Sequence, residues 1–161
     1  MKPLPGQNRL QQYNFSIMAE KLFSQEDKDI ITEAIKKAEL ETSGEIQVHL
    51  ESHCKGDVLD RAAAVFELLK MHKTKYRNAV LFYLATDDHK FAILGDAGIN
   101  AVVTPDFWEK IKDTMIVYFK NRQFTEGLRL GIEMSGKQLK AHFPYDQKGS
   151  ENELPDEISF G

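Results

Sequence analysis

The apolar run Ala79–Ala85, AVLFYLA, constrains the fold of this chain more than any other stretch. It is too short for an independent helix and has polar residues on both sides, so we expect a strand covered on both faces of its sheet. Asp87, Asp88 and His89 follow as turn residues, and Phe91–Leu94 is a second apolar run. The two runs therefore predict an antiparallel hairpin at the centre of a sheet.

The residues before this hairpin predict a strand–helix–strand unit. Within Glu45–Glu51, the apolar residues Ile46, Val48 and Leu50 alternate with polar ones, a pattern typical of a half-exposed strand. A helical apolar stripe over Val58–His72 leads from there to the central strand. A unit of this length usually crosses over right-handed, so its two strands are expected to pair in parallel.

Further helices are expected on both sides of this unit. Ser24 caps a first helix that runs to about Leu40. Thr104 followed by Pro105 opens a later helix, and a last one ends near His142. Together these elements predict an α/β fold, with a small mixed β-sheet (a parallel β-α-β unit plus an antiparallel hairpin) sandwiched by about four helices.

The composition fits one globular domain. The chain has 161 residues, of which 42% are hydrophobic and 29% charged, as in ordinary single domains. We expect a flexible leader over 1–22, the α/β domain over 23–144 and a mobile acidic tail over 145–161. The formal charge of −4 lies wholly in that tail, where five acidic residues face one lysine.

The sequence argues against several classes of function. Because residues 1–143 carry no net charge, they offer no basic excess for phosphates, and we expect no nucleic-acid binding. The single cysteine, Cys54, excludes an internal disulfide and a cysteine-based zinc site. No apolar run approaches the ~18 residues that span a bilayer, and the first residues lack the apolar core of a secretory signal. We therefore expect a cytoplasmic monomer without a transmembrane segment.

The predicted topology gathers polar and glycine residues at one edge of the sheet, where the first two strands begin and the third ends. This edge contains Ser43, Gly44, Glu45, Arg77, Asn78, Gly95, Asp96 and Gly98. Its glycines leave room for a close approach to the backbone. The oxygens of Glu45, Asp96 and Asn78 are hard ligands that suit calcium or magnesium. Asp87 and Asp88 form a second candidate pair at the opposite edge. Capping and turn formation are the alternative roles for these residues.

No catalytic residues are predicted. Gly131–Lys137 approaches the phosphate-binding loop pattern, but Gln138 stands where a Ser or Thr belongs, and the segment lies inside a helical stripe. The nucleophile elbow motif of the α/β-hydrolases does not occur. The catalytic machinery, if any exists, is therefore unknown from the residues alone.

Four short segments occur in an order and spacing that resemble a known family. They are Ser43–Ile46, Asn78–Phe82, Asp88–Ile99 and Phe119–Gly127. Over about residues 23–144 the chain resembles the TPM domain, also called the TPM phosphatase domain, as a soluble bacterial-type member. Ala79 replaces a glycine of the family pattern, and the spacing between Gly95 and Gly98 is one residue longer than in that pattern.

The resemblance implies an α/β sandwich that binds a divalent cation, calcium above all, and for some plant members an acid phosphatase activity. The favoured hypothesis is a calcium-binding domain that acts through a protein partner with little or no catalysis of its own. The alternative is a metal-dependent acid phosphatase in which Glu45 or Asp96 orients a metal-bound water. In that alternative, Arg77 is the one evident cationic group for the phosphate.

The acidic tail contains three apolar residues, Leu154, Ile158 and Phe160, at irregular spacing. A purely solvating tail has little use for them, because low hydrophobicity and high charge favour disorder. We therefore predict a docking segment over Leu154–Phe160, after a mobile stretch over Tyr145–Asn152. The segment would fold back onto its own domain or bind a protein partner, and a wholly disordered tail is the remaining alternative.

Overall fold

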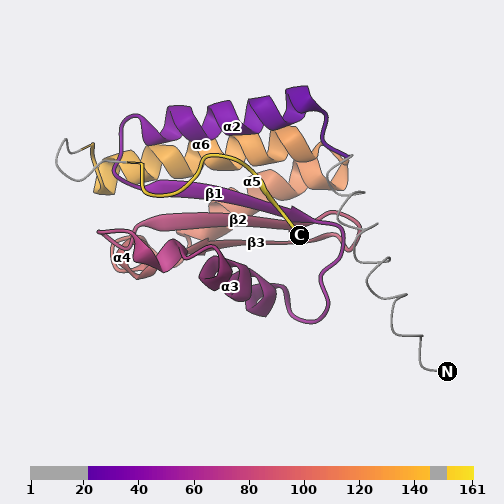
Figure 1. Ribbon diagram of the computed structural model, residues 1–161, viewed down its shortest axis with the longest axis horizontal. Coiled ribbons are helices and arrows are strands. Elements are labelled where there is room, and N and C mark those ends of the chain that lie inside the picture. Colours follow the sequence, from indigo (N-terminus) through magenta and orange to yellow (C-terminus); the bar gives the residue numbers. More distant parts are fainter. Residues whose placement is uncertain (1–21, 146–151) are drawn as a thin grey trace.

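The computed structural model describes residues 22–145 and 152–161, and it shows a mixed sheet between two layers of helices (Figure 1). The strand order is β3-β2-β1-β4. The strands are β1 (Glu45–Glu51), β2 (Ala79–Ala85), β3 (Lys90–Gly95) and β4 (Ser159–Phe160). β1 pairs in parallel with β2, which pairs antiparallel with β3. The predicted α/β fold, with its β-α-β unit and hairpin, is confirmed.

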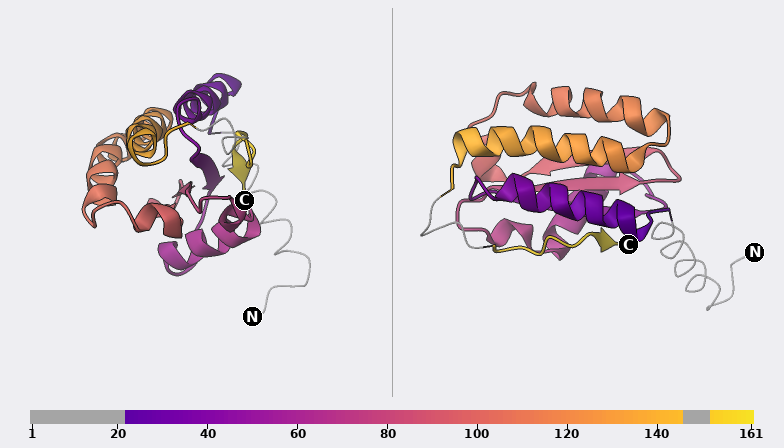
Figure 2. Two further views of the ribbon diagram at one scale, coloured as in Figure 1. Left: turned by 90° about the vertical axis from the view of Figure 1, so that its left-hand side faces the viewer. Right: turned by 90° about the horizontal axis from the view of Figure 1, so that it is seen from above.

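The helices divide between the two faces of the sheet. They are α2 (Gln25–Glu39), α3 (Val58–Leu68), the 3-10 turn η1 (Met71–Lys73), α4 (Ala97–Asn100), α5 (Phe107–Lys120) and α6 (Phe124–His142). Figure 2 shows α2, α5 and α6 together on one side of the sheet and α3 on the other. Within the described residues, no helix is long and apolar enough to cross a membrane.

Two helix boundaries differ from the sequence prediction. α3 ends at Leu68 instead of near His72, because Lys70 adopts a left-handed conformation (φ 55°) that a helix cannot continue. α5 begins at Phe107, two residues later than proposed, with Asp106 at its cap position. The predicted capping of α2 by Ser24 and the end of α6 at His142 agree with the structure.

The two faces of the sheet differ in chemistry. On the face under α2, α5 and α6, alternate residues of β1 and β2 enter one apolar core, among them Ile46, Val48 and Phe82. On the other face, Leu81 and Tyr83 of β2 pack against α3 and η1 in a second core. β1 contributes to this second face only polar side chains. We call these four residues, Glu45, Gln47, His49 and Glu51, the polar row.

The prediction of a half-exposed β1 is wrong, because all seven of its residues are buried. The polar row is only 2%, 3%, 3% and 7% exposed in chain order. Its cover is the end of the chain, residues 152–161, which we call the C-terminal segment. Figure 1 shows this segment, in yellow, running along β1 towards the C-terminus. A pattern within β1 alone cannot reveal a cover supplied from more than a hundred residues away.

The C-terminal segment is anchored to its own domain. Leu154 is 8% exposed and belongs to the second core, while Ile158 and Phe160 pack against the first. β4 pairs in parallel with β1 at His49 and Leu50. Of the two docking alternatives, the structure shows the fold-back onto the domain. Binding of a protein partner through the same three residues stays a prediction.

Two other predictions fall mostly outside the described residues. The flexible leader was predicted over 1–22, of which the structure describes only Leu22. The mobile stretch was predicted over 145–152, of which residues 146–151 lie outside.

Candidate functional site

The polar row of β1 meets the C-terminal segment one residue after another. The backbone N–H of Glu153 donates to Oε1 of Glu45 over 2.8 Å. Nε2 of Gln47 donates to the carbonyl of Pro155 over 3.4 Å. Nδ1 of His49 lies 2.9 Å from Oγ of Ser159. Alternate residues of a strand point to one face, so a single extended segment can contact Glu45, Gln47 and His49 in turn.

The acidic end of the row gathers three carboxyl groups. Glu39, from the last turn of α2, lies in contact with Glu45 of β1 and with Asp156 of the C-terminal segment. Burial, and then the charges of Glu45 and Asp156, raise the pKa of Glu39 from 4.5 to about 10. Burial also raises the pKa of Glu45, to about 7, although the Glu153 N–H bond opposes the rise. In the described part of the chain, no Lys or Arg forms an ion pair with these three carboxyls.

A groove of about 330 Å³ opens beside this acidic end. Its walls come from the end of α2, the entry to β1 and the C-terminal segment, and they include Ser43, Gly44, Glu45 and Asp156. Lys36 also lines the groove, but its ammonium is paired with Glu33 at 3.9 Å. The groove therefore has acidic walls.

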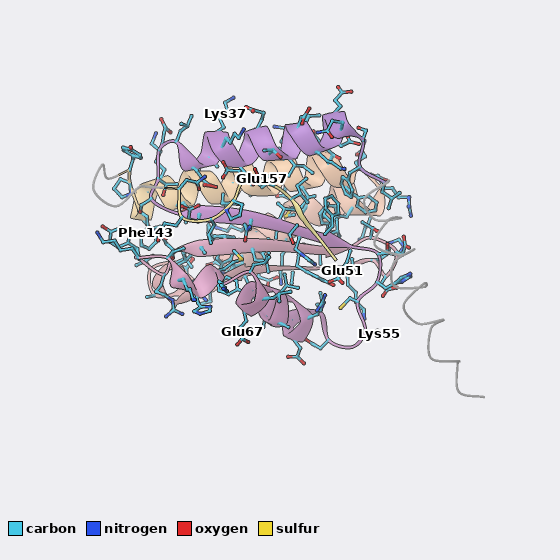
Figure 3. The ribbon with its side chains drawn as sticks, in the orientation of Figure 1. Lys37, Glu51, Lys55, Glu67, Phe143 and Glu157 are labelled. Carbon is cyan, nitrogen blue, oxygen red and sulfur yellow. The ribbon has the colours of Figure 1, made fainter. Side chains whose placement is uncertain are left out.

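The other end of the row is neutralised. Glu51 receives two hydrogen bonds from the Arg61 guanidinium of α3, at 2.9 Å from Nε and 3.2 Å from Nη2. Burial would raise the pKa of Glu51, but the contacts with His49 and Arg61 outweigh it and lower the pKa from 4.5 to about 2. The His49 ring stacks on Tyr83 with 5.9 Å between centroids. Figure 3 shows Glu51 at the end of the sheet opposite Phe143.

The two carboxylates of the predicted metal site, Glu45 and Asp96, do not come together in the structure. Glu45 and Asp96 do lie at one edge, but β2 separates their strands, which places their backbones roughly 10 Å apart. Asp96 is engaged elsewhere. Its carboxylate accepts from Nε of Arg77 at 2.7 Å and from Nη2 at 2.8 Å, and it also caps α4 by accepting from the N–H of Ala97. The bond to Ala97 matches the capping alternative.

Asn78 links the entries of β1 and β2. Its Nδ2 donates to Oγ of Ser43 over 3.1 Å, and its backbone N–H donates to Oγ1 of Thr74. Its Oδ1 is buried and has no hydrogen-bond partner among the described residues. The side chain therefore ties two strands together, while one oxygen atom remains available.

The chain itself fills the space beside the glycines of this edge. A Cβ at Gly98 would lie 2.2 Å from the carbonyl oxygen of Tyr76, so only glycine permits that backbone approach. A Cβ at Gly95 would lie 2.4 Å from the Trp108 ring. Of the residues predicted to line a cleft, Ser43 and Gly44 line the acidic groove, and Arg77, Gly95 and Gly98 do not.

Asp87 and Asp88 lie at the opposite edge, as predicted, and contact His53. Oδ1 of Asp88 lies 2.9 Å from Nδ1 of His53, and its Oδ2 accepts the backbone N–H of Cys54 over 2.7 Å. The hydrogen bond to His53 is the main reason that the pKa of Asp88 is lowered. Asp87 approaches Nε2 of the same ring at 3.6 Å. These contacts tie the β2–β3 turn to the end of β1.

The carboxyl groups are not preformed for a metal. Across residues 22–145 and 152–161, no group of three or more His, Cys, Asp or Glu side chains is arranged to hold an ion. The acidic end nevertheless has suitable donors, because calcium and magnesium bind carboxylate oxygens. One oxygen each of Glu39 and Asp156 is buried without a hydrogen-bond partner from the described residues.

Sequence reasoning found Glu45 but missed its partners. Glu39 and Asp156 come from the end of a helix and from a tail predicted to be mobile, and no local pattern connects them. Gln47, His49 and Glu51 were taken for solvent-facing residues. One signal for their burial was present, namely the apolar Leu154 and Phe160 in an otherwise acidic tail, which need a surface to cover.

Comparison with known proteins gives the chain its family. The family model of the TPM domain matches residues 17–138, and no curated protein matches. The NMR structure of the BA42 protein from the psychrophilic bacterium Bizionia argentinensis has 45% sequence identity and a TM-score of 0.81, covering 86% of this chain and 95% of that one.

A second solved structure is the N-terminal domain of the cg2496 protein from Corynebacterium glutamicum. It has 15% identity and a TM-score of 0.59 over 73% of this chain and 74% of that one, a likeness that shows the fold alone. The sequence match over most of the chain and the shared sheet with its helices lead to one conclusion: this protein belongs to the TPM domain family.

Proposed function

We propose that this protein is a binding domain that takes up a divalent cation, calcium before magnesium, and acts through a protein partner without catalysis of its own. The observation that carries the proposal is the contact among Glu39, Glu45 and Asp156, with the pKa of Glu39 raised to about 10. Near neutral pH, this cluster retains a proton because no positive charge of the described residues offsets its carboxylates. A divalent ion would replace that proton and relieve the repulsion among the carboxylates.

Calcium suits the cluster better than magnesium. The three carboxyls come from α2, β1 and the C-terminal segment, so the distances between them can adjust as the segment shifts. Calcium accepts six to eight oxygen ligands in flexible geometry, whereas magnesium requires a near-ideal octahedron and releases its waters reluctantly. Because the site is not preformed, we expect weak affinity, in the submillimolar to millimolar range typical of roughly 10⁻⁴–10⁻³ M sites.

The phosphatase alternative has less support. Arg77, its one evident group for holding a phosphate, is paired with Asp96 through two hydrogen bonds. Asp96 is thereby engaged as well, and it stands two strands away from Glu45. A phosphoryl transfer site needs its cations and water-orienting groups to converge on one point.

The decisive experiment titrates the intact protein with calcium and, separately, magnesium while backbone amide shifts are recorded. We expect shifts at Glu39, Glu45 and Asp156, accompanied by release of a proton into weakly buffered solution. The variant Glu39→Gln should lose most of the calcium response. Glu33→Gln, a change on the exposed face of the same helix, should keep it. Unchanged amide positions at millimolar calcium in the wild type would refute cation binding at this cluster.

A further inference from the structure

We infer that the polar row and the outer edge of β1 form a groove for an extended peptide of a partner protein, one that carries a basic side chain where this chain carries Asp156. The C-terminal segment is the groove's built-in occupant, paired with β1 over two residue pairs, and the partner peptide displaces it. The bound peptide would run parallel to β1, in the direction that the segment takes. Addition of a strand to an exposed sheet edge is a common mode of peptide recognition.

The contacts of the segment define what the groove recognises. Glu45 accepts a hydrogen bond from a backbone N–H, and Gln47 donates one to a backbone carbonyl. His49 forms a hydrogen bond with a hydroxyl. Two of these three contacts use the peptide backbone and are available to any extended chain. The backbone of β1 adds one more, because the carbonyl of Leu50 accepts the N–H of Gly161 over 2.9 Å.

Two apolar anchors fix the position of the occupant along the groove. Leu154 enters the second core next to β2 and α3. Six residues later, Phe160 packs against the first core with the ammonium of Lys28 5.4 Å from its ring centre. Side-chain pockets of this kind give specificity to backbone-mediated strand addition. The groove therefore selects peptides with a leucine-like residue and, six positions on, an aromatic one.

The present occupant is only partly matched to the groove. β4 pairs with β1 over two residue pairs, whereas β1 has seven residues. A longer strand from a partner would pair with more of this edge. The charge is also mismatched, since Asp156 lines the acidic groove together with Glu39 and Glu45, two further carboxyls. A lysine at that position would turn a repulsion into an attraction, and the acidic segment of a second copy of this chain would not.

The peptide groove rests on one part of the proposed function, namely action through a protein partner, and does not depend on cation binding. The peptide needs no metal, so the experiments below are run in the presence of a chelator. Failure of peptide binding and failure of calcium binding are then separate results.

The test uses two ten-residue peptides with the sequence of 152–161, one carrying Asp156→Lys and the other Glu157→Lys. They have equal charge, but Glu157 is exposed, and Figure 3 shows it on the segment above β1. Each is titrated into full-length protein carrying Leu154→Asp, which releases its own segment by placing a charge in an apolar pocket. We expect the Asp156→Lys peptide to bind roughly tenfold more tightly than the Glu157→Lys peptide. The reason is that an attraction between the lysine and the carboxyl groups equal in free energy to one pKa unit changes an equilibrium constant by a factor of ten. The amides of Glu45–Glu51 should shift.

Full-length variants test the same idea without any added peptide. Asp156→Lys in the intact chain should slow hydrogen exchange at the Gly161 amide by about tenfold, on the same scale, whereas Glu157→Lys should leave it near the wild-type rate. Equal affinity of the two peptides, or binding that leaves the β1 amides unmoved, overturns the inference. Should the Leu154→Asp protein fail to fold, equal exchange rates in the two full-length variants overturn it instead.

Discussion

Glu45 and Glu51 stand at opposite ends of the same strand, on the same face, and both are almost fully buried. Their carboxyl groups nevertheless behave in opposite ways. The pKa of Glu45 is raised to about 7, while that of Glu51 is lowered to about 2. Burial acts in the same direction on both. The difference comes from the neighbours. Hydrogen bonds from His49 and Arg61 outweigh burial at Glu51, whereas at Glu45 burial prevails over the hydrogen bonds with the Glu153 N–H and Glu39.

The comparison separates the end of the polar row whose charge is satisfied by its neighbours from the end at which we propose binding. At the Glu51 end, the charge is satisfied within the chain, and the desolvation of the carboxylate is offset by paired hydrogen bonds. At the Glu45 end, no Lys or Arg among the described residues pairs with the cluster, and the pKa values of Glu39 and Glu45 are raised. Charge left uncompensated in a groove is what a ligand can supply, so we place binding at Glu45 and stability at Glu51.

Removal of the compensating charge should have the largest effect. Arg61→Met keeps much of the side-chain volume but leaves the buried Glu51 carboxylate without the Arg61 guanidinium. Leaving a buried charged group unsatisfied costs about 2–3 kcal/mol. The free energy of unfolding at neutral pH should fall by about that amount. Chemical denaturation measures it. Arg129→Met is the matched control, because its partners Glu126 and Glu133 are exposed, and it should cost less than about 1 kcal/mol.

Weaker attachment of the C-terminal segment should affect both ends of the polar row at once. Leu154→Ala removes the anchor of the C-terminal segment in the second core, which should cost about 2 kcal/mol. Hydrogen exchange at the Gly161 amide should accelerate, and the pKa of Glu45 should move towards 4.5 as water enters. Leu59→Ala, on an exposed position of α3, is the control and should change neither quantity. An unchanged Gly161 exchange rate in Leu154→Ala would show that the segment is held by other contacts.

The two ends should also give stability opposite dependences on pH. Glu51 is more acidic in the folded state, so its contribution is present above pH 4.5 and is lost as the pH falls towards 2. Glu39 and Glu45 hold protons more tightly when folded. Their contribution is present below pH 4.5 and is lost as the pH rises, through about 7 for Glu45 and about 10 for Glu39.

Glu39→Gln should flatten the alkaline side of this profile. Glutamine imitates the protonated carboxyl and cannot ionise. The free energy of unfolding of the variant should therefore exceed that of the wild type near pH 9 by more than one pKa unit of interaction, about 1.4 kcal/mol. Denaturation curves across pH measure the difference. Below pH 4.5 the two proteins should be nearly equal. A constant offset at every pH would mean that the cluster does not share a proton.

The smallest effect is expected for Ser159→Ala. The variant loses the hydroxyl that meets Nδ1 of His49, but the backbone pairing of β4 remains. A single neutral hydrogen bond contributes about 1 kcal/mol or less. The ring nitrogen shifts of His49 should change clearly, while the melting temperature moves little.

The fold was predictable because its signals are local. The hairpin of β2 and β3, the parallel β-α-β unit and the capping of α2 by Ser24 each follow from neighbouring residues, and the structure agrees. The short helix α4 was missed because Asp96 and the glycines around it were assigned to a strand end and loop. The burial of β1 was mispredicted because its cover lies at the far end of the chain.

The candidate site was predictable only in part. Glu45 was chosen because it opens a strand at a glycine-containing edge, and that reasoning led to the acidic groove. Asp96 was chosen on the same grounds, but the ion pair with Arg77 engages it. Pairing between side chains two strands apart, or between a helix end and a tail, depends on packing that no local pattern contains.

The most direct test of this account is a carbon-detected NMR titration of the side-chain carboxyls in the full-length protein. We expect Glu51 to titrate near 2, Glu45 near 7 and Glu39 near 10. Glu33, exposed on α2, serves as the internal reference. Coincident titration of Glu45 and Glu51 near 4.5 would contradict this account. It would mean that the C-terminal segment and α2 do not create a binding site at the Glu45 end, and that α3 does not hold Glu51 in a structural ion pair.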